Sequence, residues 1–283
     1  MKTVWSWQSL VAAMLSLVLN AAIAADSGKT SYSIAVVPQF RAEEIHRDWT
    51  PALERLRAAT GASFSLRIAA DIPAFEESML AGEPDFAYMN PYHQVMARKA
   101  QGYIPLVRDS KPLTGILVVR KDDPIKSARE LDGKEVAFPA PNAFGASLWI
   151  RALLAEREKI RILPVYVKTH SNAFRYAATG RAAAAGGIGV TLVDEPEELR
   201  STLRVLLETP GVAPHPLSAH PRIPEAVRRL VAETLLGMAQ DVGGQAMLKD
   251  IQMPTPVRAD YSRDYQPLEK FGLEKYVVRA TKP

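Results

Sequence analysis

Three short segments of this 283-residue sequence place polar side chains beside the start of a predicted helix, which is where binding chemistry is expected. The segments are residues 88–93, 138–147 and 168–172. Each follows an apolar run and leaves free backbone N–H groups at its helix start, and such groups favour an anion. Turns of this kind also occur throughout α/β proteins without any ligand. Spacing alone therefore leaves an anion site and an ordinary structural turn both open.

The sequence lacks the residue patterns of hydrolytic, metal and nucleotide chemistry. It contains no H-E-x-x-H, no G-x-S-x-G and no P-loop, and residues 145–149 start like a nucleophile elbow but lack its final glycine. His215 and His220 stand five residues apart in a Pro-rich segment without a third ligand nearby, so we interpret them as surface residues. We therefore expect no metal, no cofactor and no enzymatic activity.

The elements that position these turns form a repeated strand–helix alternation. In the first half, strands are expected at 33–37, 64–68, 86–89 and 104–107, with helices at 49–60, 72–80 and 91–99. Asn90 is a good N-cap for the last of these helices, and Pro91 suits its first position. A second series has strands at 116–119, 135–138, 162–167, 183–190 and 203–207, with helices at 146–155 and 171–179. The alternation predicts mostly parallel sheets with helices on both faces.

Two breaks divide the predicted elements into lobes. The first is at 111–115; the second is the Pro-rich segment 209–224, which we interpret as a crossing that precedes helices at 224–238 and 242–249. The expected layout is a first lobe at 25–115, a second lobe at 116–213 and a return to the first lobe at 214–283, with hinges near 112–115 and 209–216. One doubly wound domain without a crossing is the alternative. Because ligands in open α/β sheets lie outside the carboxyl ends of strands, the three turns should share one cleft.

The N-terminus and the composition point to an exported protein. Residues 1–24 have Lys2, an apolar run at 10–19 and an Ala22-Ile23-Ala24 cleavage site, which together predict a signal peptide and a periplasmic location. An uncleaved anchor is the alternative. The absence of cysteine excludes disulfides and thiolate metal clusters. A formal net charge of +4 without a basic, aromatic-rich stripe argues against nucleic acid and suits a small anionic ligand.

The segment Asp85–Met96 resembles the D-I-A-W-F-G-P-x-S-Y segment of periplasmic substrate-binding proteins of phosphonate, phosphite and phosphate ABC transporters, and the likeness extends from Tyr32 to Phe271. The resemblance implies a two-lobed type II periplasmic binding protein of the α/β class, with two interlobe crossings. It implies a monomeric, non-enzymatic receptor that hands a small anionic solute to an inner-membrane permease. A sensor that docks on a membrane histidine kinase would have the same fold and remains the alternative.

The sequence departs from this family where the family holds its ligand. A Ser-Thr-Ser-like run precedes the matching glycine in the family, whereas Asn142-Ala143-Phe144 precedes Gly145 here. The loss of three hydroxyls predicts at least about tenfold weaker phosphonate binding. The segment 184–189 also lacks the acidic residue that pairs with the ammonium group of aminophosphonates in the family.

Other parts of the family's site are kept. Thr169-His170-Ser171 resembles a Ser-His-Asp-like segment in which the histidine contacts the ligand. The Asn142 amide and the backbone N–H groups of Gly145 and Ala146 can still donate to an anion, and Phe144 adds apolar surface. The expected ligand-binding residues are Gln39, Phe40, Tyr88, Asn90, Tyr92, Asn142, Phe144, Gly145, Ala146, His170 and Ser171.

Overall fold

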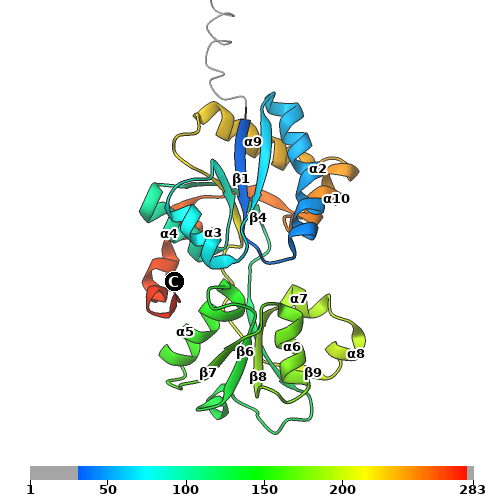
Figure 1. The fold of residues 1–283 in the computed structure, drawn as a ribbon, viewed down its shortest axis with the longest axis vertical. Coiled ribbons are helices and arrows are strands. Elements are labelled where there is room, and N and C mark those ends of the chain that lie inside the picture. The colour runs from blue at the N-terminus through cyan, green and yellow to red at the C-terminus, as the bar shows by residue number, and fades with distance from the viewer. Residues whose placement is uncertain (1–30, 279–283) are drawn as a thin grey trace, which may run out of the picture.

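The strand–helix alternation forms two separate sheets, one in each of two lobes (Figure 1). A computed structural model describes residues 31–278 of the chain. The predicted signal peptide lies outside the described residues. Within residues 31–278, no helix is both long enough and apolar enough to span a membrane. The two-lobed α/β prediction is confirmed, and the alternative of one continuous doubly wound sheet is excluded.

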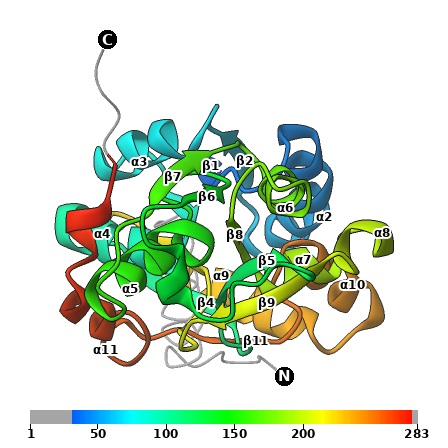
Figure 2. The ribbon, with the colours of Figure 1, turned by 90° about the horizontal axis from the view of Figure 1, so that it is seen from below.

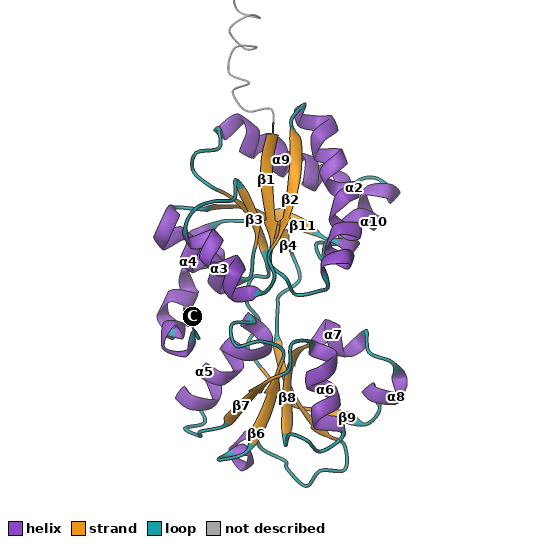
Figure 3. Cartoon of the chain, in the orientation of Figure 1, coloured by secondary structure: helices purple, strands orange, loops and turns teal. Residues whose placement is uncertain are grey.

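The first lobe contains a six-stranded sheet in the order β11-β4-β10-β3-β1-β2. Four strands are parallel, while β10 and β11 run against them. Figure 3 shows α3 and α4 on one side of this sheet and α2 and α10 on the other. The elements are β1 (Ser31–Val36), α2 (Ala42–Thr60), β2 (Ser63–Ile68), α3 (Ile72–Leu80), β3 (Phe86–Tyr88), α4 (Pro91–Gln101), β4 (Ile104–Asp109), β10 (Pro216–Ala219), α9 (Glu225–Met238), α10 (Val242–Asp250) and β11 (Pro256–Arg258).

The second lobe contains a five-stranded sheet in the order β7-β6-β8-β5-β9, in which only β5 is antiparallel to its neighbours. A π-helical turn (Phe144–Leu148) leads into α5, and a short 3-10 helix (Ala128–Leu131) precedes β6. The remaining elements are β5 (Gly115–Arg120), β6 (Glu135–Phe138), α5 (Trp149–Glu156), β7 (Leu163–Tyr166), α6 (His170–Ala178), β8 (Ala184–Ile188), α7 (Gly189–Val193), α8 (Glu197–Arg200) and β9 (Leu203–Glu208).

Alternation along β5 explains why helices cover both faces of the second sheet. Leu117 and Val119 face one apolar cluster with α5, whereas Ile116 and Val118 face another with α6. Successive strand residues point to opposite faces, so a run of apolar residues requires cover on each side. Figure 2 shows α5 and α6 on opposite sides of the strands.

The predicted helix start at Asn90 is confirmed. The Asn90 side chain accepts a hydrogen bond from the His93 backbone N–H at 2.8 Å, and Pro91 occupies the first turn. Gly102 ends the helix in the left-handed region at φ 76°, which costs glycine little because it has no Cβ. The short link from β3 to α4 therefore holds Asn90 at the carboxyl end of a central strand.

Two sequence interpretations of the elements were wrong. The Pro-rich segment 209–224 is not only a crossing, since it contains β10 at the centre of the first sheet. Pro216 is the first residue of that strand, a position that proline tolerates. The strand predicted at 183–190 is shorter: β8 ends at Ile188, and α7 begins at the next residue, Gly189.

Two chain segments cross between the lobes and pair with each other. Leu113 and Val212 exchange backbone hydrogen bonds of 2.8 and 3.0 Å, and Thr209 Oγ1 accepts the Gly115 N–H at 2.8 Å. These segments join β4 to β5 and β9 to β10. The lobe boundaries at 115/116 and 213/214 stay a prediction.

The C-terminal segment is a further link that the sequence did not suggest. After β11, the chain forms α11 (Tyr261–Asp264) and two 3-10 helices (Gln266–Phe271 and Leu273–Tyr276). The first 3-10 helix contacts α4 of the first lobe, and the second contacts α5 of the second lobe. In Figure 1 this red segment lies beside both helices. We call residues 261–278 the C-terminal strap.

Candidate ligand-binding site

A cleft of about 1150 Å³ lies between the lobes and is lined by both of them. Its first-lobe wall comes from the loops after β1 and β2 and from Asn90. Its second-lobe wall comes from residues 139–146, from the segment after β7 and from the region of α7. Because these are mainly segments that follow strands, the carboxyl ends of both sheets face this interlobe cleft, as the sequence analysis expected.

Most of the predicted site residues lie on this cleft, but three do not. Tyr88, Tyr92 and Asn142 are absent from its walls, so for them the expectation of a cleft position is wrong. The residues that do line it are Gln39, Phe40, Asn90, Phe144, Gly145, Ala146, His170 and Ser171. Contact of these eight with a ligand stays a prediction.

Both tyrosines are core residues. The Tyr88 ring packs 5.1 Å from the Trp49 ring and stacks 5.6 Å from the His215 ring, measured between ring centroids. Tyr92 packs in an apolar cluster with Phe144, and its hydroxyl donates to Glu274 of the C-terminal strap at 3.3 Å. Burial, followed by the nearby Glu274 charge, raises the pKa of Tyr92 to about 12. Each ring fills space that an apolar side chain would otherwise occupy.

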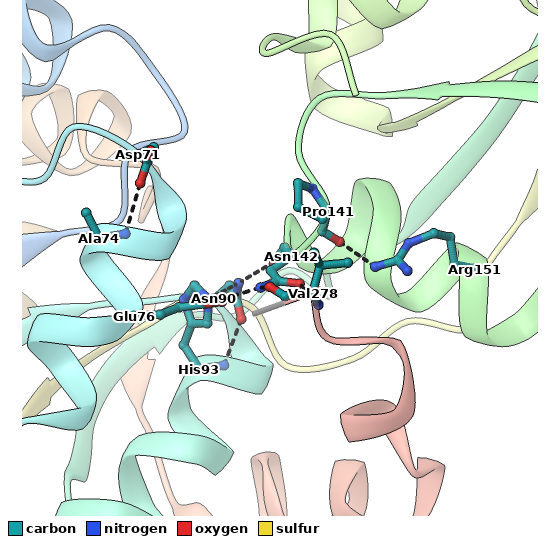
Figure 4. A network of polar contacts seen from close by, with 9 residues as sticks. All are labelled: Asp71, Ala74, Glu76, Asn90, His93, Pro141, Asn142, Arg151 and Val278. Atoms are coloured by element: carbon teal, nitrogen blue, oxygen red, sulfur yellow. Dashed lines mark hydrogen bonds and ion pairs between the residues drawn. The ribbon is translucent and has the colours of Figure 1, made fainter. Parts of the chain in front are cut away.

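Asn142 joins the two lobes instead of facing a ligand (Figure 4). Its Nδ2 donates to Glu76 Oε2 and to the Val278 carbonyl, both at 2.9 Å, and its Oδ1 accepts the Val278 N–H. Asn90 Nδ2 donates to the Asn142 carbonyl at 3.3 Å, and Glu76 also contacts buried His93 at 2.8 Å. We call these five residues the interlobe clasp. It ties the second-lobe turn at 139–143 to α3, to α4 and to the C-terminal strap.

The start of α6 contributes several polar groups to the second-lobe wall. Thr169 caps the helix by accepting the Asn172 N–H at 3.1 Å, and the Ser171 hydroxyl donates to Glu195. His170 Nδ1 lies 3.3 Å from Thr191 Oγ1. Burial lowers the pKa of His170 to about 4, so the ring is neutral at neutral pH.

His215 is a cleft residue that the sequence analysis missed. We interpreted it as a surface residue, but it lines the cleft, and its Nε2 lies 2.6 Å from Gln39 Nε2. Burial, followed by the nearby His93, lowers its pKa to about 3. The sequence could have indicated this role only through the position of His215 directly before β10, and the prolines around β10 hid that strand.

The charges on the cleft walls are mixed. Lys168 and Arg175 line the second-lobe wall, and no described carboxylate lies within ion-pair distance of either. Asp194 and Glu195 line the same wall. Segment 184–189 has no acid, as noted from the sequence, but Asp194 and Glu195 follow α7 and bring two carboxylates to the same wall. Whether an ammonium group binds there stays a prediction. Among residues 31–278, no three histidine, aspartate or glutamate side chains are grouped to hold a metal ion.

Comparison with known proteins places the chain in a family. Residues 34–265 match the model of the family described as ABC transporter, phosphonate, periplasmic substrate-binding protein. The chain belongs to this family. The resemblance noted from Asp85–Met96 is thereby confirmed, and the family is periplasmic and consists of transporter binding proteins, not enzymes.

Individual relatives are distant. The phosphate-import protein PhnD of Mycolicibacterium smegmatis is 23% identical over 137 residues, which cover 46% of this chain and 43% of that protein. This match thus spans less than half of the relative's length. PhnD1 of Prochlorococcus marinus, solved in complex with methylphosphonate, has a TM-score of 0.76 and 13% identity, covering 87% of this chain and 98% of that one. A binding component of a Pseudomonas aeruginosa phosphonate transporter has a TM-score of 0.73, 14% identity and 87% coverage of both chains. These structures establish the shared fold.

Proposed function

We propose that the protein is the solute receptor of an ABC transporter, and that it binds a small phosphonate-like or related organic anion in the interlobe cleft for delivery to an inner-membrane permease. The observation that carries the proposal is the convergence of helix starts on one cleft. The first turns or caps of five helical segments line it: α2, α3 and α4 from the first lobe, and the π-helical turn and α6 from the second. Unpaired N–H groups at such ends favour an anion.

The side chains suit an anion that is held more by backbone groups and cations than by hydroxyls. Ser171 donates to Glu195, and Thr191 donates to the Ile188 carbonyl, so neither hydroxyl hydrogen is free for a ligand. Lys168 and Arg175 supply positive charge on the same wall. Each lost hydroxyl contact would have contributed about 0.5–1.5 kcal/mol, so we expect phosphonate binding at least about tenfold weaker than with a Ser-Thr-Ser run.

A thermal-shift screen of the purified mature protein tests the proposal, because a ligand that binds the folded state raises the unfolding midpoint. The panel consists of phosphate, phosphite, methylphosphonate, 2-aminoethylphosphonate, sulfonates and carboxylates. At least one anion should raise the midpoint, and Lys168→Met should reduce that shift. Lys134→Met, at an exposed position outside the cleft lining, serves as the matched control and should leave the shift unchanged. If no anion of the panel raises the midpoint, the proposed function is contradicted.

A further inference from the structure

The Thr191 hydroxyl lies between two groups of the second-lobe wall. Its Oγ1 is 2.9 Å from the Ile188 carbonyl oxygen and 3.3 Å from His170 Nδ1. Ile188 is the residue before α7, and His170 is the first residue of α6, so this contact joins two helix starts at the cleft. A hydroxyl has one hydrogen to donate and lone pairs with which to accept.

The position of that single hydrogen decides which nitrogen of His170 carries a proton. A carbonyl oxygen can only accept, so the 2.9 Å oxygen–oxygen contact is attractive only if the Thr191 hydrogen lies between Thr191 and Ile188. Thr191 Oγ1 then meets His170 Nδ1 with a lone pair. This second contact is favourable only if Nδ1 carries its own hydrogen and donates to Thr191.

The other ring nitrogen of His170 is therefore a bare acceptor. Burial keeps the ring neutral at neutral pH, and a neutral imidazole with a protonated Nδ1 has no hydrogen on Nε2. No described residue makes a hydrogen bond to Nε2. Nε2 is also not one of the fully buried atoms that lack a partner, so it reaches solvent. Because His170 lines the cleft, this lone pair is available to a ligand.

The side chains of Ser171, Asp194 and Glu195 also offer hydrogen-bond acceptors, not donors, to this part of the cleft wall. Ser171 has donated its hydrogen to Glu195, and the carboxylates of Glu195 and Asp194 can only accept when ionised. Donors come instead from the backbone of the helix starts and from Lys168 and Arg175. An anion whose every polar atom is an acceptor would face the His170 lone pair with another lone pair.

We propose that His170 is a hydrogen-bond acceptor that makes the receptor select anions carrying an O–H or N–H donor beside the anionic group. This inference rests on the proposed function and adds a selection rule to it. A monoprotonated oxyanion fits the rule, and a fully deprotonated oxyanion of the same shape does not. Two acceptors that face each other without a hydrogen between them are costly in a desolvated site. The anion that carries a donor should therefore bind about tenfold more tightly, or better, than the anion without one.

The tautomer can be measured without any ligand, by long-range proton–nitrogen NMR correlation on the full mature protein. Comparison with His170→Gln assigns the His170 signals. We expect the pattern of a neutral ring protonated on Nδ1. A ring protonated on Nε2, or on both nitrogens at neutral pH, would overturn the inference and leave the proposed receptor function intact.

Selection is measured with two anions of matched shape and charge. Methylphosphonate at mildly acidic pH is a monoanion with one O–H, and methanesulfonate is a monoanion with none. By calorimetry, methylphosphonate should bind about tenfold more tightly or better. Thr191→Val, which removes the acceptor of the Nδ1 hydrogen, should shrink the ratio, whereas Thr234→Val, on α9 and outside the cleft lining, should not. Equal binding of the two anions would refute the selection rule, and failure of every anion to bind would remove both this rule and the receptor function.

Discussion

Asn142 illustrates how a residue identified correctly as polar and well placed was given the wrong role. Its amide was expected to donate to an anion, but both ends of the amide are occupied within the interlobe clasp. Its partners Glu76 and Val278 lie 66 and 136 residues away in the chain. Local spacing revealed the turn, because caps and helix starts depend on neighbouring residues. It could not reveal partners that only the tertiary fold brings together.

Replacing Asn142 by alanine should destabilise the protein by roughly 1–3 kcal/mol. The change leaves Glu76 Oε2 without its partner, and a buried unsatisfied group costs about 1–3 kcal/mol. Val278 is exposed, so water can replace the partner that its N–H loses. Urea unfolding of the two proteins measures the difference. Asn172→Ala is the control, because the Asn172 amide makes one hydrogen bond, to the Val167 carbonyl, and should cost less. A loss no larger than that of the control would show that the clasp contributes little to stability.

At the scale of elements, the sequence predicted most strands and helices because apolar periodicity and caps are local signals. It missed β10, whose four residues lie among prolines, and it could not explain the glycines of β8. A Cβ added to Gly186 would lie 2.1 Å from the Ala146 carbonyl oxygen. Gly186 therefore allows the π-helical turn to pack directly on the strand. The glycine run was visible in the sequence, but the reason for it depends on a distant element.

Specific side-chain contacts attach the C-terminal strap to the second lobe, and they can be tested by substitution. One Arg151 nitrogen donates to the carbonyls of Pro141 and Tyr276, each at 2.7 Å, and the Phe271 ring packs edge-on against Trp149 at 4.5 Å. Between its two 3-10 helices, Gly272 adopts the left-handed region at φ 59°, where the strap passes from one lobe to the other.

Arg151→Met should loosen the strap from the second lobe, because methionine fills similar apolar space without donating to either carbonyl. Hydrogen exchange followed by mass spectrometry should show faster exchange in residues 273–278, since local opening costs less free energy when these contacts are lost. Exchange in β4 should be unchanged. Arg161→Met, at an exposed position whose backbone rather than its side chain makes the hydrogen bond, is the control. Unchanged exchange in residues 273–278 would mean that Arg151 does not hold the strap.

At the scale of the whole molecule, three chain segments within residues 31–278 span the lobes, in addition to the direct clasp contacts of Asn142 with Glu76 and Asn90. Two are the paired crossings at Leu113 and Val212, and the third is the C-terminal strap. The crossings were predictable because proline and glycine mark breaks between strands, and each lobe has its own sheet. The third connection was not predictable, since its contacts depend on α4 and α5 meeting at the same side of the cleft. Motion of one lobe against the other must therefore accommodate all three segments and the clasp contacts of Asn142.

Ligand binding should close the lobes, with the change in backbone angles concentrated near 112–115 and 209–216. Each lobe has its own core and can move as a rigid body, so hinge segments absorb the rotation. A cleft of about 1150 Å³ exceeds what a small anion fills, and closure lets both walls contact it. Small-angle scattering with a saturating anion from the thermal-shift screen should show a smaller radius of gyration than without it. Without ligand, the Arg151→Met variant should have a larger radius of gyration than the wild type, because the substitution weakens the attachment of the strap to the second lobe. Identical scattering with and without bound ligand would contradict closure, whatever the variant does.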